Sequence, residues 1–336
     1  MNRGINRRVF YSKFGRPDVL DIVNDSEIPQ ISDDEVLIRT ESVSINPKDT
    51  LLRKGKFSKT LGRDPLPRGT ALDASGVVVK VGSKVAGLSE GDRVFAMTNR
   101  FCGGLMADFI ALPESEVALA PTVIALNDSS SIPLAGLTAL QGLRDCGRVQ
   151  SGATVLIIGS AGGVGHFACQ IAVAMGADVS AVCSAKNRKY TQSLGVKETI
   201  CYDEVDILKL EASFDVVFDV SGKYEPNQFK SVLASRGSFV STVPKPSSIF
   251  GELLSRLRIS HRSRLVIVNS NSDDLCQLAG MVNMGQLKPT VSHRFSLSEV
   301  ALAHHQMETG HTVGKIIVKL NAVSYTHLTL PTTSRV

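Results

Sequence analysis

A glycine-rich segment at residues 159–165 is where residue types and spacing first point to chemistry. It reads Gly-Ser-Ala-Gly-Gly-Val-Gly, between an apolar run at 155–158 and an apolar, Ala-rich run at 166–175. These runs predict a strand and a helix, and a glycine turn between them is typical of a dinucleotide-binding site, because glycines let the backbone approach a pyrophosphate at the helix N-terminus. The candidate phosphate contacts are Gly159, Ala161, Gly162, Gly163, Val164 and Gly165. The alternative is a glycine turn that only packs the helix on the strand.

The residues after the next predicted strand, 178–182, indicate which nucleotide such a site would prefer. A site for NAD usually has Asp or Glu there, about 20 residues after the glycine loop, to accept from the ribose hydroxyls. This chain has no acid at that point and instead has Ser184, Lys186 and Arg188, which suit a 2′-phosphate. The alternative is a solvated cationic helix start, although cations are unfavourable near a helix N-terminus. The segment therefore favours NADPH over NADH.

The elements that must position these residues fall into two patterns. The first 120 residues contain short strand-like runs separated by turn residues, among them 8–11, 36–40, 77–81 and 93–96, which is typical of all-β structure. From residue 127 onward strands and helices alternate. The predicted strands are 155–158, 178–183, 214–220, 237–242 and 265–268, and the predicted helices lie within 129–143 and at 166–175, 186–194, 227–233 and 273–284. Such alternation predicts an α/β fold with a doubly wound parallel sheet.

The end of the chain returns to the first pattern. Residues 298–308 are predicted to be helical, and 315–320 resemble the strands near the start. We therefore expect one domain from residues 1–125 and 293–322, with residues 126–292 inserted as the dinucleotide-binding domain. Residues 323–336 are rich in Thr and Ser, and we expect a non-native or disordered tail there. A native flexible tail is the alternative.

Composition and charge exclude several classes of function. Of the 336 residues, 43% are hydrophobic and 21% are charged, as in ordinary globular proteins. The net charge of +5 comes without a long basic block, so we expect no nucleic-acid partner. No apolar run approaches the roughly 20 residues that a membrane span needs. The six cysteines include no C-x-x-C pair, and the basic N-terminal stretch is shorter than a typical transit peptide, so we expect a cytoplasmic protein with reduced thiols.

Several short motifs together carry a resemblance to a known family. They are SINPKD at 44–49, LDASGVV at 72–78, GDRV at 91–94, AGLTA at 135–139, the glycine loop, VCS at 182–184, FDVVFD at 214–219, GQLKP at 285–289 and GKIIV at 314–318. Over residues 8–320 the chain resembles the zinc-independent quinone oxidoreductase (zeta-crystallin-like) branch of the medium-chain dehydrogenase/reductase superfamily. The resemblance implies a GroES-like β domain and a Rossmann domain, with NADPH in the cleft between them. It also implies hydride transfer to a quinone or an electron-poor double bond.

The same resemblance implies roles for individual residues. It places one group at the adenosine end and the 2′-phosphate, a second group around the nicotinamide, and a third at the floor of the substrate pocket. The group at the adenosine end and the 2′-phosphate is Ser184, Lys186 and Tyr202. The group around the nicotinamide is Thr138, Ser221, Gly222, Asn269 and Lys315, and the pocket floor is Asn46 and Asp49. In one respect the chain departs from the family, which usually has glycine two residues before Asp73, where Ala71 stands here. We expect this difference to affect a backbone turn and to leave the cofactor assignment intact.

Simpler interpretations stay open for four of these residues. Asn46 and Thr138 are candidate hydrogen-bond donors to a substrate carbonyl or to the nicotinamide amide. Asn46 could instead be a turn residue before a proline, and the Thr138 hydroxyl could bond its own helix. For Asp49 a helix cap is favoured over a catalytic acid. Tyr202 could be an aromatic residue at a strand end.

The residues needed for zinc are missing where the superfamily would have them. Zinc alcohol dehydrogenases use a thiolate near position 46 and a Gly-His-Glu near position 72, where this chain has Asn46 and Leu72-Asp73. It also lacks the four closely spaced cysteines of a structural zinc lobe, and zinc needs three or four such ligands. We therefore expect no metal site, and we interpret His304, His305 and His311 as surface or helix-end residues.

The function expected from the sequence is NADPH-dependent, zinc-independent reduction of quinones or α,β-unsaturated carbonyls. Two alternatives remain: a non-catalytic NADPH-binding sensor or scaffold, and a zinc alcohol dehydrogenase. A homodimer is also possible, because sheet edges in Rossmann domains of this superfamily often pair. The elements nearest that edge would be residues 237–243 and 265–268.

Overall fold

A six-stranded parallel sheet, built from the middle of the chain, confirms the predicted doubly wound fold. The strand order is β11-β10-β9-β12-β13-β14, and every neighbouring pair is parallel. In chain order the strands are β9 (Thr154–Ile158), β10 (Asp178–Cys183), β11 (Glu198–Cys201), β12 (Phe214–Asp219), β13 (Leu233–Ser241) and β14 (Ser263–Leu265). The chain order reverses direction between β9 and β12, which is the point where ligands bind in open sheets of this kind.

Both faces of this sheet are covered, which explains why β9 is apolar at every position from 155 to 158. Val155 and Ile157 join a core with helices α3 (Pro133–Gln141), α4 (Gly165–Ala174) and α7 (Ser272–Asn283). Leu156 and Ile158 point to the opposite face and join a second core with Phe229. Each fully buried side chain of this size contributes roughly 1.5–3 kcal/mol.

A seven-stranded mixed sheet forms the second part of the molecule. Its order is β15-β16-β3-β5-β6-β8, with β7 paired to β3. The strands are β3 (Glu35–Ile45), β5 (Asp73–Val81), β6 (Arg93–Met97), β7 (Phe109–Pro113), β8 (Val117–Leu119), β15 (Val291–Ser296) and β16 (Lys315–Lys319). Because β16 pairs antiparallel with β3, the predicted return of the last strand to the first part of the chain is confirmed. A small third sheet contains β1 (Ile5–Tyr11), β2 (Asp21–Glu27) and β4 (Arg68–Gly69).

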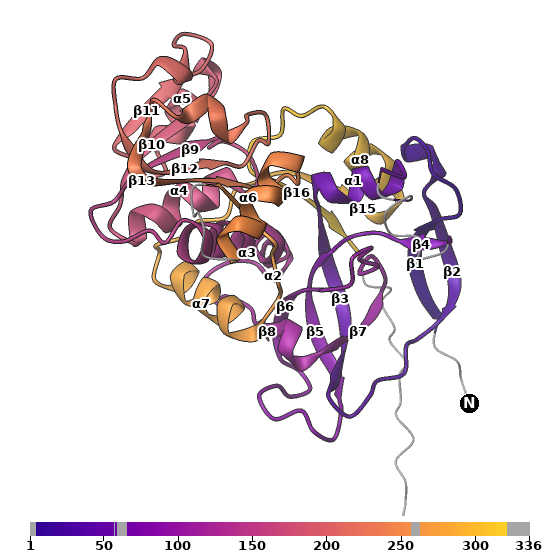
Figure 1. Ribbon diagram of the computed structural model, residues 1–336. Helices are drawn as coiled ribbons and strands as arrows, with labels where there is room; N and C mark the ends of the chain where they lie inside the picture. Colours follow the sequence, from indigo (N-terminus) through magenta and orange to yellow (C-terminus); the bar gives the residue numbers. More distant parts are fainter. Residues whose placement is uncertain (1–4, 57, 59–65, 257–262, 321–336) are drawn as a thin grey trace, which may run out of the picture.

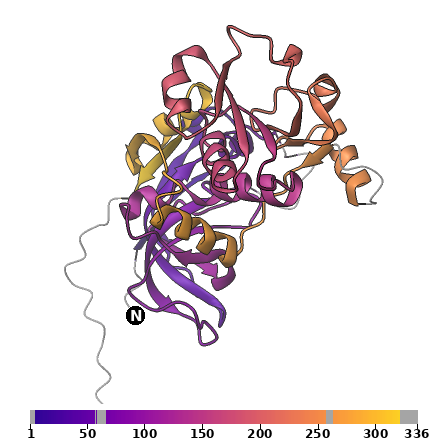
Figure 2. The same cartoon turned by 90° about the vertical axis from the view of Figure 1, so that its left-hand side faces the viewer.

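The helices of the two ends of the chain lie together. Figure 1 shows α8 (Val300–Glu308) beside α1 (Pro47–Arg53), at the border between the two large sheets. The remaining helices are α2 (Leu126–Ser129), α5 (Arg188–Gln192) and α6 (Pro246–Arg256). Figure 2 shows α6 at the outer margin of the parallel-sheet part, on the side opposite α8. The border between the sheets is therefore formed by segments from both ends and the middle of the sequence.

One predicted helix was right in place and another was wrong in extent. The helix expected within 129–143 is α3, which begins at Pro133 because proline has no N–H to continue a preceding helix but fits the first turn of a new one. The helix expected at 227–233 is only a 3-10 turn, Pro226–Phe229. The chain then becomes extended, because Leu233 already pairs with Phe214 of β12. The turn itself is capped by Glu225 and Gln228.

The structure describes residues 5–56, 58, 66–256 and 263–320. The tail expected at 323–336 lies outside these residues. Within the described ranges no helix has the length and apolar character needed to cross a membrane.

Candidate functional site

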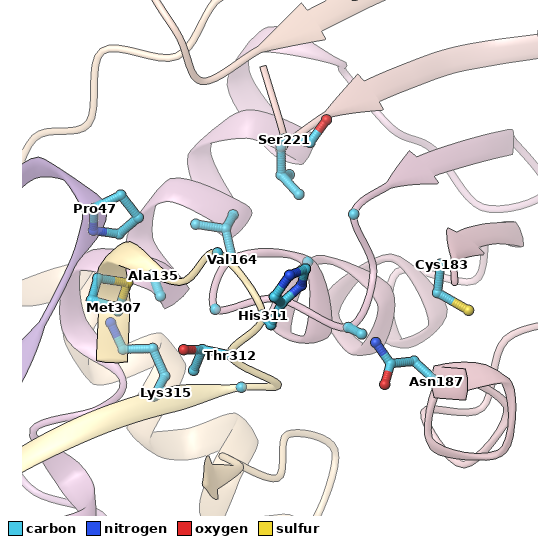
Figure 3. Close-up of a pocket in the computed structure, with 18 of the residues that line it drawn as sticks. Pro47, Ala135, Val164, Cys183, Asn187, Ser221, Met307, His311, Thr312 and Lys315 are labelled. Carbon is cyan, nitrogen blue, oxygen red and sulfur yellow. The ribbon is translucent and has the colours of Figure 1, made fainter. Parts of the chain in front are cut away.

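A cavity of about 480 Å³ lies between the two large sheets, above the glycine loop. Figure 3 shows Pro47, Ala135, Met307 and Lys315 at one end, and Cys183 and Asn187 at the other. The cavity therefore extends from the mixed sheet, through the switch point of the parallel sheet, to the loop after β10.

The glycine loop forms the middle of the cavity wall, with all six predicted residues in the lining. Gly159 has φ of +89°, a left-handed conformation that side-chain-bearing residues rarely adopt. A Cβ on Gly165 would lie only 2.1 Å from the Gly159 carbonyl oxygen, so glycine is needed where α4 begins. A Cβ on Gly163 would lie 3.2 Å from Lys315 Cδ and 3.4 Å from the Gly314 oxygen. The loop thus presents mostly main chain to the cavity, with the start of α4 behind it, which is the kind of surface that binds a pyrophosphate.

The end of the cavity beside β10 contains most of the residues predicted for the 2′-phosphate and adenosine. Ser184, Lys186 and Tyr202 line it. Lys223 also lines it, with its Nζ 5.6 Å from the centroid of the Tyr202 ring. Arg188 is not in the lining. Its guanidinium pairs with Glu204, and its Nε donates to the Cys201 sulfur, so of the two predicted cations it is Lys186 that lines the cavity.

The opposite end is organised by a buried polar cluster around Asp73, which is fully buried. One oxygen of Asp73 accepts from the Ser44 hydroxyl and from Asn46 Nδ2 at 2.9 Å, and the other accepts from the Leu134 N–H at 2.7 Å. Lys315 Nζ lies 3.7 Å from Asp73 and donates to Asn46 Oδ1. Asn46 and Lys315 line the cavity, whereas Asp73 lies outside the lining and contacts both side chains.

Asp49 lies behind this end as well, and its contacts are those of a cap. It accepts from the Asn46 N–H at 2.8 Å at the start of α1 and from the Ala71 N–H at 3.1 Å. Ala71 has φ of +69°, so the position where the family usually has glycine is indeed a left-handed turn. Burial raises the pKa of Asp49 to about 7, against the lowering effect of the Asn46 N–H. Asp49 is not in the cavity lining, and its catalytic role stays a prediction.

Three of the residues expected around the nicotinamide do not line the cavity. The Thr138 hydroxyl donates to the Leu134 carbonyl, at 2.6 Å, within its own helix. Asn269 donates its backbone N–H to Gln141 and its Nδ2 to the Ser270 carbonyl. Gly222 packs so closely that a Cβ would lie 2.2 Å from Val243.

Ser221, in contrast, lines the cavity together with Val220. The buried Asp219 accepts from the backbone N–H and the hydroxyl of Ser221 and from the Gly222 N–H. These bonds fix the turn after β12 and so determine where Ser221 lies.

A segment at 310–314, which we call the strap, lines the cavity and was not expected there from the sequence. Gly310 and Gly314 are left-handed, with φ of +69° and +66°, and the Gly314 N–H donates to the Ala161 carbonyl of the glycine loop at 2.9 Å. Between them His311 and Thr312 line the cavity, and Figure 3 shows His311 across its middle. His311 is exposed, as the sequence interpretation had it, but that interpretation did not foresee its place in the cavity lining. The two glycines that flank it, next to the last strand, were the available signal.

The strap follows α8, and α8 is fixed to α1 by buried charges. Arg53 is fully buried, pairs with Glu308, donates to the Gly15 carbonyl and donates through Nε to His304 Nδ1 at 3.4 Å. His304 is also fully buried, contrary to its interpretation as a surface or helix-end residue. Burial, with a smaller effect of Arg53, lowers the pKa of His304 to about 3.

This neutral histidine leads to an expected pH dependence of stability. The unfolded chain takes up a proton on His304 near pH 6.5, but the native protein does so only near pH 3. Acid therefore favours the unfolded state as the pH falls through this window. Between pH 7 and pH 5 the free energy of unfolding should fall by about 2 kcal/mol. His304→Leu should remove this part of the slope in urea unfolding curves. His305→Leu, at the exposed neighbour, should retain it, and equal slopes for wild type and His304→Leu would contradict the assignment.

Within the described part of the chain, no group of three or more His, Cys, Asp or Glu side chains is placed to hold a metal ion. The described cysteines are all free thiols.

Comparisons with known proteins agree with this architecture. Residues 32–122 match the family described as alcohol dehydrogenase GroES-like domain, and residues 194–318 match the family described as zinc-binding dehydrogenase. The 2-methylene-furan-3-one reductase of Solanum lycopersicum is 33% identical over 321 residues, covering 92% of this chain and 77% of that protein. The chloroplastic NADPH-dependent alkenal/one oxidoreductase of Arabidopsis thaliana is also 33% identical, covering 92% and 78%.

A solved structure extends the comparison to three dimensions. The quinone oxidoreductase from Coxiella burnetii superposes with a TM-score of 0.85 at 30% identity, covering 94% of this chain and 100% of that chain. The chain therefore belongs to the medium-chain dehydrogenase/reductase superfamily, and its relatives there include quinone oxidoreductases and alkenal/one reductases.

Proposed function

We propose that the protein is an NADPH-dependent oxidoreductase that reduces quinones or α,β-unsaturated carbonyls. One observation carries the proposal: a single cavity joins a bare glycine loop, a hydroxyl and a cation at the 2′-phosphate end, and the buried Asn46–Lys315 pair at the other end. The names of the relatives, which include an NADPH-dependent alkenal/one oxidoreductase and a quinone oxidoreductase, support it.

The cavity suggests how this chain would hold the cofactor. The pyrophosphate would lie against the glycine loop at the start of α4. Ser184 and Lys186 would bind the 2′-phosphate, and Tyr202 would lie against the adenine. The nicotinamide would then extend toward Ser221, Leu134 and Asn46, as the order of these residues along the cavity requires. When bound there, NADPH supplies the hydride.

The chain's own residues would position the acceptor and exclude water. Ile45, Pro47, Leu134, Ala135 and Met307 give the end beside Asn46 an apolar wall, which suits a flat quinone or a short enone. The Asn46 side chain is fixed by Asp73 and Lys315, so its orientation is set before substrate binds. Such preorganisation is what lets a polar group act on developing charge without reorganising.

The proposal also includes features that rest on the sequence alone. The domain boundaries at 125/126 and 292/293, independence from zinc and a cytoplasmic location stay predictions, and the Arabidopsis relative is described as chloroplastic. A homodimer through the β14 edge of the parallel sheet is likewise proposed, because β14 is the last strand in its order.

The test is oxidation of NADPH by the purified protein in the presence of a quinone or a medium-length alkenal, with NADH as the control cofactor. Multiple turnover with NADPH supports the reductase, and the better acceptor defines the substrate class. Tight NADPH binding without turnover on either acceptor would favour the sensor or scaffold. If the protein neither binds NADPH nor turns over either acceptor, the proposal is overturned.

The strap gives a separate expectation about cofactor affinity. His311 lies across the cavity where the pyrophosphate would lie, and its loss should remove one hydrogen bond. His311→Ala should raise the Kd of NADPH about three- to tenfold, and that of NADH by a similar factor, since both cofactors share the pyrophosphate. NADPH fluorescence titration measures this, with His305→Ala as the matched control. An unchanged Kd would show that the His311 side chain makes no contact with the cofactor.

A further inference from the structure

A buried ammonium group lies at the end of the cavity farthest from Lys186. Lys315 is only 2% exposed, yet it lines the cavity. Its Nζ donates to Asn46 Oδ1 and lies 3.7 Å from Asp73 Oδ2. Figure 3 shows its ammonium end beside Met307, on the same side of the cavity as Pro47. An ammonium has three donors, and these two partners engage at most two of them, which leaves one for a molecule in the cavity.

The proposed reaction needs a proton at this end. Hydride addition to the β-carbon of an enone leaves an enolate, which becomes the product only when its α-carbon takes up a proton. Hydride reduction of a quinone leaves a hydroquinone anion, which takes up a proton on oxygen. In both cases one proton is consumed for each hydride transferred, and a positioned side chain can supply it.

The lining of this end offers few groups that could do so. Apart from Lys315 it includes Ile45, Asn46, Pro47, Leu134, Ala135 and Met307, and Figure 3 shows Thr312 beside Lys315. These are apolar side chains, one amide and one hydroxyl, none of which is an acid in water. Among the described residues at this end of the lining, Lys315 is therefore the one that can release a proton.

We propose that Lys315 is the proton donor of the reaction and stabilises the enolate before it is protonated. This inference rests on the proposed function. The hydride forms the β C–H bond, and the π electrons of the double bond move to the carbonyl as an enolate. A Lys315 N–H bond then breaks as the α C–H bond forms, or as the O–H bond of the hydroquinone forms. Lys315 is left as a neutral amine and regains a proton from water after the product leaves.

The groups that face Lys315 suit this role. Asp73 on β5 and Asp49 on α1 stabilise the ammonium, while burial has the larger effect and lowers the pKa of Lys315. An ammonium with a lowered pKa releases its proton more readily than an exposed lysine does. His166 on α4 also faces it, but burial lowers the pKa of His166 to about 4. That ring is therefore neutral at working pH and adds no competing cation.

The configuration of the product tests the proposal. A prochiral enone with a substituent on its α-carbon is reduced with NADPH in D₂O, and the configuration at the α-carbon is measured by chiral chromatography at short times. Wild-type protein should deliver deuterium to one face. Lys315→Gln, which keeps a donor toward Asn46, should give both configurations and lower kcat about 100-fold. Lys315→Met is the second variant, and Lys319→Met on the same strand, outside the cavity lining, is the matched control.

The pH profile separates donation from a structural role. With wild type, kcat should fall as the pH rises and Lys315 loses its proton, whereas with Lys315→Gln this decline should disappear. One product configuration and an unchanged pH profile in both Lys315 variants would overturn the proposal. A raised Kd for NADPH with unchanged configuration would overturn it too and would make Lys315 a cofactor contact. If wild type reduces neither enones nor quinones, the proposed function fails, and the inference fails with it.

Discussion

The double variant Ser184→Asp/Lys186→Glu is expected to raise the Kd of NADPH by about 100- to 1000-fold, because like charges brought together in a binding site cost several kcal/mol. Ser184 is 8% exposed and directly follows β10, and Lys186 lies two residues further on in the cavity lining. The new carboxylates would repel a 2′-phosphate but could accept hydrogen bonds from the ribose hydroxyls of NADH. The Kd of NADH should therefore stay within about threefold or improve.

The change in selectivity is measured by fluorescence titration of both cofactors at one ionic strength. Lys189→Glu is the matched control, because Lys189 is exposed on α5 and outside the cavity lining. It changes the net charge of the same segment without entering the site. If the control variant weakens NADPH binding as much as the double variant does, the effect is a long-range electrostatic one. If the double variant weakens the binding of NADPH and NADH equally, the assignment of the 2′-phosphate end is wrong.

Asp73→Asn is expected to lower the free energy of unfolding by about 3–5 kcal/mol, the range seen when one partner of a buried ion pair is removed. Asp73 is fully buried and its acceptors face the Ser44 hydroxyl, the Asn46 amide and the Lys315 ammonium. An amide group in that position presents a donor to other donors and leaves the ammonium of Lys315 without its nearest counter-charge. Denaturant unfolding, followed by circular dichroism, measures the loss.

A double-mutant cycle shows whether the charge is responsible. Asp73→Asn combined with Lys315→Met should be less destabilised than the sum of the single variants, because both members of the pair are then uncharged. Asp145→Asn is the control: its ion pair with Arg144 is half exposed, so it should cost no more than about 1 kcal/mol. Full additivity of the two changes at 73 and 315 would mean that the residues are stabilised independently.

The local pattern of the sequence determined the parallel sheet and its glycine loop. β9, the glycine turn and α4 were predicted within a residue or two, because a doubly covered strand is continuously apolar and only glycine fits at Gly165. The strands at 21–27, 109–113, 198–201 and 291–296 were missed. Several of them are short or half exposed, so their hydrophobic pattern is weak, and they are strands because a neighbour pairs with them.

The candidate residues divide in the same way. Ser184, Lys186 and Tyr202 follow directly from their places after β10 and β11, and the structure has all three in the cavity lining. Arg188 has the same charge and nearly the same sequence position as Lys186, but Glu204 lies close enough to pair with it. The spacing of residues near Arg188 does not predict this ion pair, because Glu204 belongs to the turn after the next strand.

What the sequence by itself determined is the class of fold, the glycine loop and the group of residues from which a 2′-phosphate site is predicted, since each depends on residues close together in the chain. Only the tertiary structure decided that Asn46, Asp73 and Lys315 form one buried cluster and that His311 crosses the cavity. Asn46 and Lys315 are 269 positions apart. They meet because β16 pairs with β3. In the low dielectric of the interior their electrostatic interactions are strong, so the stability of each charged group depends on its neighbours.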